Sequence, residues 1–483
     1  MAGRRSFVLV ALALYAACAL WATWPAIRHV DDHYLARPAA GHDEAAAGDH
    51  LQLGWSFWLV GHQLGDGRSP FTDPFSFRPE AEAPPNLQGW LLGLPYWAVR
   101  AALGDVWAYD LLVLLTFVAA GGLGCWWLRA LGLSRGAALL GGLVFCLMPY
   151  RVGQSTGHLL GLVSFLLPAT LLALERRRLV LAGACLVALP LSGQLHLALG
   201  AVPLVLGYSW ARLPRAEWWK AGIGAAAALV AGLAVDRWAI SGSIGTGRSF
   251  AQIDRYSAEL SDFVRRSVGS GVEELVFIGW LAPVLAVVGL VAIRRRRGLA
   301  LVLGLAALVP CLLALGANLR GYETVWRVVP GLEATRVPER VMPIACLAIA
   351  ALAAFAVDAA RARLAPVGYE RLAGVALAGL LLVLAIDLRV PVFGAVAADT
   401  PTAAYAAMRG PGRRLARELR GLSCGRGEIP AGLGVRYVAV HRGLYAQSGF
   451  FDASCPERAE AALRRAGWRL LARDGPIATY ARP

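Results

Sequence analysis

The chain has 483 residues, of which 57% are hydrophobic and only 16% are charged, and its formal net charge is +15. Soluble globular proteins carry about a quarter charged residues, and disordered proteins are poorer in apolar residues, so the composition excludes both classes. Apolar stretches that can cross a bilayer recur along the chain, which predicts an all-α polytopic membrane protein. Most arginines lie in short clusters between these stretches, as in membrane proteins, so no nucleic-acid partner is expected.

Eleven segments are predicted to cross the membrane as helices, two or three of them short. A spanning helix needs roughly 20 mainly apolar residues, and fewer where protein shields its ends. The predicted segments are 6–27, 106–128, 136–149, 158–174, 179–191, 194–209, 220–240, 273–293, 298–316, 341–360 and 372–390.

Basic clusters between these segments predict the orientation. The positive-inside rule places Arg4 and Arg5, and with them the N-terminus, in the cytoplasm. If the crossings alternate from there, every basic cluster falls on the cytoplasmic side; the clusters are Arg129/Arg135, Arg176–Arg178, Arg212/Arg215/Lys220, Arg294–Arg297 and Arg361/Arg363/Arg371. Residues 28–105, 241–272, 317–340 and 391–483 are then expected at the outer face of the cytoplasmic membrane.

Two apolar segments allow alternative interpretations. Counting residues 87–102 as a further crossing would move the later arginine clusters outside, so this segment is expected to lie on the outer surface as a helix. Residues 6–27 could form a cleaved signal peptide, but the apolar stretch exceeds the usual length and lacks a clear cleavage site, which favours a retained anchor.

The first outer segment holds five of the eight histidines and several carboxylates. After Asp49, Leu51, Trp55, Trp58 and Leu59 follow a helical spacing, which predicts a surface helix with Asp49 near its N-terminus. One interpretation makes Asp49 a capping carboxylate favoured by the helix dipole. The other makes it a general base that activates an acceptor.

His29, Asp31, Asp32 and His33 have side chains suited to a divalent cation such as Mg²⁺ or Mn²⁺. A solvated loop just past the first crossing is the other interpretation, and no further cofactor is indicated.

Two later outer segments contain arginines that the positive-inside rule would place inside. Arg336 and Arg340 precede a span, and their planar guanidinium groups suit the phosphate of a lipid-linked substrate. Pairing with nearby glutamates is the alternative. His158 and His196, at the ends of spans, are candidates to line a polar substrate cavity, and interfacial structural histidines are the alternative.

After Pro391 the composition changes, and residues 391–483 are predicted to form a small α/β domain. Helices are expected at 402–420 and 456–467, with strands near 435–440, 468–471 and 476–480. Cys424 and Cys455 share this tail, and an oxidising compartment would permit a disulfide between them.

Taken together, the chain resembles the GT-C superfamily of bacterial integral-membrane glycosyltransferases. The resemblance covers residues 1–390 in layout: one N-terminal span, a long outer loop with an acidic residue before a Trp-rich helix, and a second surface helix. Its motifs are Gly48-Asp49-His50-Leu51-Gln52-Leu53-Gly54-Trp55, the stretch Pro70 to Pro79, the turn Tyr150 to His158, Tyr256-Ser257-Ala258-Glu259-Leu260-Ser261-Asp262, and Arg336-Val337-Pro338-Glu339-Arg340.

The resemblance implies transfer of a sugar from a polyprenyl-phosphate-linked donor to a glycan, lipid or protein acceptor. Asp49 matches the position of the base in that superfamily, and Asp31 or Asp32 could provide a second acidic residue. Arg336 and Arg340 would bind the donor phosphate, and Tyr256 and Glu259 join His158 and His196 as cavity candidates.

A flippase or transporter of lipid-linked material is a competing hypothesis, and so is a structural subunit of a cell-envelope assembly. A transporter should carry polar groups near mid-membrane and often an internal repeat. The polar residues instead gather at one predicted face, which favours chemistry at that face.

Overall fold

The structure is a computed structural model. It describes residues 2–37, 49–74, 85–237, 250–254, 256–266, 272, 275–329, 332, 337–364, 370–397, 422, 424–426, 429, 435–442, 445 and 454–482.

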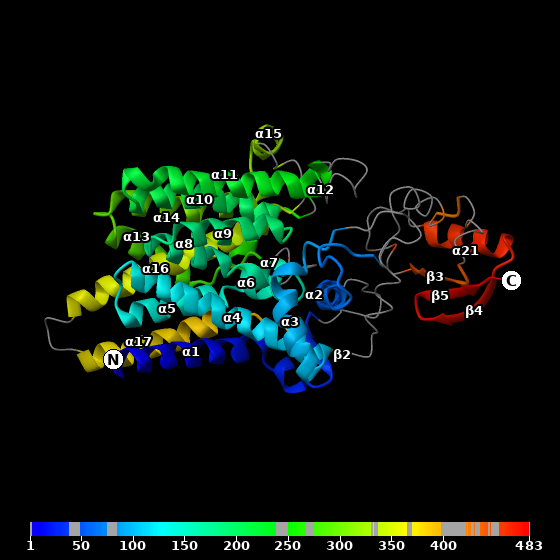
Figure 1. Ribbon diagram of the computed structural model, residues 1–483, viewed down its shortest axis with the longest axis horizontal. Helices are drawn as coiled ribbons and strands as arrows, with labels where there is room; N and C mark the ends of the chain where they lie inside the picture. The colour runs from blue at the N-terminus through cyan, green and yellow to red at the C-terminus, as the bar shows by residue number, and fades with distance from the viewer. Residues whose placement is uncertain are drawn as a thin grey trace.

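Helices dominate the described residues and lie side by side in a bundle (Figure 1). The N-terminal half contains α1 (Ala2–Thr23), α2 (Asp49–Gly65), α3 (Trp90–Leu103), α4 (Asp105–Ala130), α5 (Arg135–Leu147), α6 (Pro149–Gln154), α7 (Leu159–Val163), α8 (Leu166–Glu175), α9 (Leu179–Leu191), α10 (Leu195–Arg212) and α11 (Trp218–Val235). Then follow α12 (Phe250–Asp254), α13 (Leu281–Ala292), α14 (Arg297–Ala314), α15 (Tyr322–Val328), α16 (Met342–Leu364) and α17 (Glu370–Asp387).

Each segment predicted to span contains helix, but not always one long helix. Within the described residues, five helices are long and apolar enough to cross a membrane: Arg5–Thr23, Asp105–Ala130, Arg215–Val235, Arg297–Ala314 and Pro338–Leu364. Five further apolar helices are shorter. The total of eleven crossings therefore stays a prediction.

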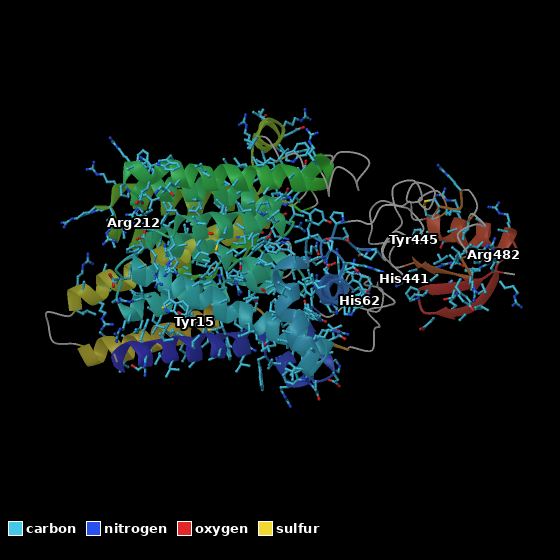
Figure 2. The ribbon with its side chains drawn as sticks, in the orientation of Figure 1. Tyr15, His62, Arg212, His441, Tyr445 and Arg482 are labelled. Carbon is cyan, nitrogen blue, oxygen red and sulfur yellow. A yellow bond between two sulfur atoms is a disulfide. The ribbon has the colours of Figure 1, made fainter. Side chains whose placement is uncertain are left out.

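The arginine-bearing connections gather at one end of the bundle, which is the arrangement that alternating crossings require. The N-terminus and Arg212 lie at this end, opposite α2 and α3 (Figures 1 and 2). Contacts join these connections directly: Ser134 N to Asp358 Oδ1 (2.7 Å), Arg296 Nη1 to Leu131 O (3.4 Å), Arg177 Nη1 to Glu217 Oε2 (2.9 Å) and Arg212 Nε to Glu175 Oε1 (2.7 Å).

Exposed tryptophans mark both ends of the bundle. Trp210 and Trp219 are 51% and 61% exposed near the arginine-bearing end. Trp24, Trp97, Trp107 and Trp280 are 41–56% exposed; Trp97 lies in α3, and the other three lie at or next to the ends of α1, α4 and α13. Tryptophan favours the membrane–water interface, so these positions are consistent with an interfacial belt at each end of the bundle.

The centre of the bundle is α16, which is buried from Met342 to Ala356. Small residues let its neighbours approach closely, as in other membrane helices. A Cβ atom on Gly289 of α13 would lie 1.8 Å from Leu352 O, and one on Gly141 of α5 would lie 3.1 Å from Ala350 O.

Two small sheets complete the fold. β1 (His33–Ala36) pairs antiparallel with β2 (Gly394–Ala397), so the segment after α1 meets the segment after α17. Near the C-terminus, β3 (Tyr437–His441), β5 (Ile477–Ala481) and β4 (Arg469–Asp474) form an antiparallel sheet in that order. The helix α21 (Cys455–Arg465) packs on this sheet through Leu463.

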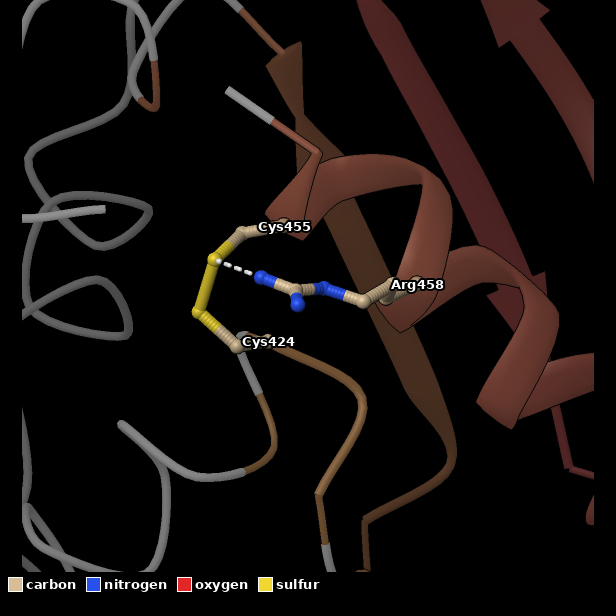
Figure 3. Close-up of a disulfide and its surroundings, with 3 residues drawn as sticks. All are labelled: Cys424, Cys455 and Arg458. Atoms are coloured by element: carbon tan, nitrogen blue, oxygen red, sulfur yellow. Dashed lines mark hydrogen bonds between the residues drawn. A yellow bond between two sulfur atoms is a disulfide. The ribbon is translucent and has the colours of Figure 1, made fainter. Parts of the chain in front are cut away.

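Polar contacts stabilise this C-terminal unit. Cys424 and Cys455, the pair for which the sequence allows a disulfide, are bonded to each other, and Arg458 donates to the Cys455 sulfur (Figure 3). The Glu460 side chain is only 3% exposed. Burial opposes ionisation of its carboxyl, but hydrogen bonds from Arg473, Tyr480 and Arg442 outweigh burial and lower the pKa. The helix predicted at 402–420 lies outside the described residues.

Tyr15 fixes α1 against α4 and α5, and this contact generates a test of the packing. A Cβ atom on Gly142 would lie 2.2 Å from the Tyr15 hydroxyl and 2.5 Å from Gly121 O. We therefore expect Gly142→Ala to destabilise the protein by about 1–3 kcal/mol, as overpacking does. Thermal unfolding in detergent measures the effect. The matched control is Gly222→Ala in α11, where an added Cβ meets nothing within 4 Å and should not lower stability. Equal melting temperatures for both variants would contradict this description of the packing.

Candidate functional site

Asp49 begins α2, at the end of the bundle opposite the arginine-bearing connections. Its side chain is 56% exposed. Its Oδ2 atom lies 2.9 Å from Nε2 of His158, the residue that precedes α7. The structure thus brings together two residues that the sequence predicted separately, and the Asp49 carboxylate has a charged or hydrogen-bonding partner beyond its own helix.

The other ring nitrogen of His158 also has a partner. Its Nδ1 atom lies 2.8 Å from Oε1 of Gln154, at the end of α6. Gln154 Nε2 donates to the carbonyl of Val272 at 3.4 Å, which fixes the orientation of the amide. Both ring nitrogens of His158 therefore have partners, one on Asp49 and one on Gln154, which fixes the orientation of the ring.

A glycine allows this close approach. A Cβ atom on Gly157 would lie 3.2 Å from the Cβ of Asp49 and 3.2 Å from the backbone nitrogen of His50. These distances are tighter than ordinary contacts, so a larger residue would displace either the turn or the start of α2.

The strand β1 and the residue after it are anchored next to this pair. Leu35 N donates to Oδ1 of Asp110 at 2.8 Å, and Arg37 N donates to Thr156 O at 3.3 Å. The Tyr34 ring lies 5.5 Å from the His50 ring. Asp110 is 1% exposed, so a buried carboxylate on α4 holds the strand that runs beside the Asp49–His158 pair.

Beneath the pair, α6 is anchored by a fully buried arginine. Arg151 donates through Nε to Ser164 Oγ, through Nη1 to Cys146 O and through Nη2 to Thr116 O, at 2.9–3.0 Å. Its guanidinium also lies over the Phe117 ring, 4.4 Å from the centroid. All of these partners are neutral, and together they tie α6 to α4, α5 and the segment that follows α7.

An apolar cavity of about 420 Å³ lies between α10, α14 and the start of α16. Its lining is almost entirely aliphatic, as in sites for hydrocarbon. His196 lines it, as does Pro338, two residues before Arg340. The cavity expected from the sequence was polar, so the lining of this apolar cavity by His196 does not test that prediction; His158, Tyr256 and Glu259 do not line it.

A cluster of possible metal ligands follows α1. His29, Asp32 and His33 have ligand atoms within 4.8 Å of one another, and His33 Nδ1 lies 2.5 Å from Asp32 Oδ1. This hydrogen bond lowers the pKa of the Asp32 carboxyl. No hydrogen bond or ion pair joins Asp31 or Asp32 to Asp49 among the residues that the structure describes. The role of Asp31 or Asp32 as a second acidic residue alongside Asp49 stays a prediction.

The remaining candidates have local contacts or cannot be placed. Glu259 is exposed and caps a short 3₁₀ helix at Leu260–Phe263, together with Asp262. Tyr256 and Arg340 are half-buried. Arg336 lies outside the described residues.

Three residues of the site escaped prediction from the sequence: Gln154, Arg151 and Asp110. Gln154 stands four residues before His158, a spacing that could have indicated a contact. Arg151 and Asp110 lie in or beside apolar segments, and no local pattern distinguishes them from residues that face solvent.

Comparisons with known proteins give matches among solved structures alone. No protein-family model matches the chain, and no curated protein does. The apo crystal structure of the Archaeoglobus fulgidus oligosaccharyltransferase is similar, with a TM-score of 0.48 and 13% identity over 88% of this chain and 58% of that one. The arabinofuranosyltransferase AftD from Mycobacteria gives 0.46 and 15% identity over 93% of this chain and 40% of that one.

The oligosaccharyltransferase AglB from Archaeoglobus fulgidus, solved with an inhibitory peptide and a dolichol-phosphate, gives a TM-score of 0.45 and 12% identity. That match covers 89% of this chain and 59% of AglB. The chain thus spans about two fifths to three fifths of the proteins it matches.

Proposed function

We propose that this protein is a membrane glycosyltransferase that transfers a sugar from a polyprenyl-phosphate-linked donor to a glycan, lipid or protein acceptor. The observation that carries the proposal is the hydrogen-bonded chain Asp49–His158–Gln154. His158 contacts the exposed carboxylate of Asp49, and Gln154 contacts the other ring nitrogen of His158. A carboxylate fixed in this way at the end of an apolar bundle suits a general base that acts on a substrate at the membrane surface.

Each group has a defined part in the proposed reaction. Asp49 accepts the proton of the acceptor hydroxyl, whose oxygen attacks the anomeric carbon of the donor sugar. The bond between that carbon and the phosphate oxygen breaks, and polyprenyl phosphate leaves with the electron pair. Arg340, and Arg336 with it, would neutralise the phosphate charge.

His158 is a positioning residue in this proposal. Its Nε2 atom lies 2.9 Å from Oδ2 of Asp49, and this contact holds the carboxylate in one orientation at the start of α2. It contacts Oδ2 of Asp49, so Oδ1 is the oxygen assigned to the acceptor.

The apolar cavity provides a place for the hydrocarbon of the donor. Its residues on α10 and α14, including Leu204 and Leu305, would contact the polyprenyl chain, and Pro338 connects this wall to Arg340. A lipid seated here would have its phosphate near the start of α16.

The site would act at the outer face of the cytoplasmic membrane. This orientation follows from assigning the arginine-bearing end of the bundle to the cytoplasm. On this assignment, residues 1–390 form the catalytic membrane domain, and residues 391–483 form an extracytoplasmic domain.

The direct test is a transfer assay on Asp49. Purified protein is supplied with radiolabelled polyprenyl-phospho-sugars and a mixture of membrane glycolipids as acceptors. We expect Asp49→Asn to reduce transfer about 10²–10⁴-fold, since a general base contributes that much. Asp66→Asn is the matched control, because Asp66 follows α2 at its other end, and should retain transfer. Donor binding without transfer or hydrolysis by the wild-type protein would instead favour a transporter or structural subunit.

A second test concerns the support of Asp49. His158→Ala and Gly157→Ala should each lower kcat about 10–100-fold, because small displacements of a catalytic group are costly. The KM for the donor should stay nearly unchanged, since neither residue lines the apolar cavity. A loss through donor KM alone, with an unchanged kcat, would contradict the positioning role.

A third test concerns the hydrocarbon of the donor. Ala306→Phe would place a ring in the apolar cavity, and we expect it to raise the KM for long-chain donors at least several-fold more than for short-chain ones. Leu301→Phe, on the same helix at a position 54% exposed, is the matched control. Equal effects of Ala306→Phe on both donor lengths would exclude this cavity as the binding site of the chain.

A further inference from the structure

We propose that His29, Asp32 and His33 form a binding site for a zinc-type divalent metal ion. The site lies where the first outer segment leaves α1, and it is distinct from the Asp49–His158 pair.

The local backbone brings the three ligands together. His29 ends the 3₁₀ helix at Ala26–His29, and His33 begins β1 after a short turn that contains Asp32. One nitrogen of each histidine and one Asp32 oxygen lie within 4.8 Å of one another. The two imidazole rings meet edge to face, with centroids 5.6 Å apart.

This spacing is close to what a metal ion requires. In a tetrahedral zinc site with bonds of about 2.0–2.1 Å, neighbouring ligand atoms are about 3.3 Å apart. His33 Nδ1 and Asp32 Oδ1, at 2.5 Å, are nearer than that, so a bound ion would replace their hydrogen bond. Rotation of exposed side chains in a turn supplies the remaining adjustment: the side chain of Asp32 is 67% exposed and that of His33 is 30% exposed.

The ligand types select the metal. Two imidazoles and one carboxylate suit zinc and neighbouring late transition metals, whereas Mg²⁺ prefers oxygen ligands and Mn²⁺ binds such sites more weakly. Zn²⁺ therefore suits these three ligands better than Mg²⁺ or Mn²⁺. Three protein ligands leave one position for water or for a further ligand.

The position indicates a structural role. His33 pairs with Ala397 of β2, and the same strand reaches Asp110 through Leu35 and Thr156 through Arg37. His33 and Arg37 are separated by about 13 Å of extended chain. Arg37 contacts the turn that carries His158, so the ion would bind at the opposite end of β1 from that turn. It would hold together the exit of α1 and the β1–β2 sheet without taking part in proton transfer.

Metal binding by the full chain tests this directly. The protein is purified without a histidine tag, stripped with EDTA and titrated with Zn²⁺ by calorimetry, and with Co²⁺ by visible absorption. We expect one equivalent to bind, tetrahedral Co²⁺ bands, and no displacement by millimolar Mg²⁺. His29→Gln combined with His33→Gln should weaken Zn²⁺ binding at least 100-fold. The matched control is His62→Gln on α2, which should bind Zn²⁺ as the wild type does.

Other results would overturn the site. Unchanged Zn²⁺ affinity in the double variant, equal loss in His62→Gln, or no binding by the wild type would each do so. If the double variant melts below the EDTA-treated wild type, Asp32→Asn is used in its place. We expect Asp32→Asn to lower the Zn²⁺ affinity at least tenfold, and an unchanged affinity would contradict the site. Because binding is measured without a sugar donor, its failure leaves the proposed transferase untouched, and a failed transfer assay leaves the metal site untouched.

Discussion

The contact between Asp49 and His158 joins residues 109 positions apart in the sequence, and the candidate site depends on it. The pair itself contributes little to stability, because the Asp49 side chain is more than half exposed and exposed ion pairs are worth roughly 0–1 kcal/mol. The surrounding fold therefore determines the position of these two side chains, and their contact adds little to the stability of the fold. A contact that the surrounding structure maintains at no evident gain in stability is a reasonable place to look for function.

The bilayer explains why so much of the helical layout could be predicted. Backbone N–H and C=O groups in lipid must form their hydrogen bonds within helices, so the composition of a long apolar segment is enough to predict a helix. The arginine clusters further predict which connections lie at the same end of the bundle, and these connections do contact one another there. Hydropathy could not show that the segment at 158–174 is divided into α7 and α8, because the break accompanies a tertiary contact: Ser164 Oγ accepts a hydrogen bond from the buried Arg151.

Asp49 and His158 could each be singled out from the sequence, but their contact with each other could not be predicted. Asp49 stood out because it precedes a Trp-rich helix, and His158 because it begins an apolar segment, yet neither pattern contains the other. The pairing of β1 with β2 was missed for the same reason: both strands have only four residues and come from opposite ends of the chain. The C-terminal strands were easier, because they lie close together in the sequence and because residues 435–440 and 476–480 alternate in hydrophobicity as strands do.

Arg151 shows how a buried charge and an exposed one are linked in this fold. A guanidinium without a carboxylate partner is costly to bury unless each side of the group is hydrogen-bonded, and here three of its nitrogens and one face have partners. Those partners come from α4, α5 and the segment after α7, so their positions determine where α6 can lie. Gln154 ends α6 and fixes His158, and His158 fixes the exposed carboxylate of Asp49. The orientation of the proposed base is therefore set by a charge buried inside the bundle, where sequence hydropathy alone would not place one.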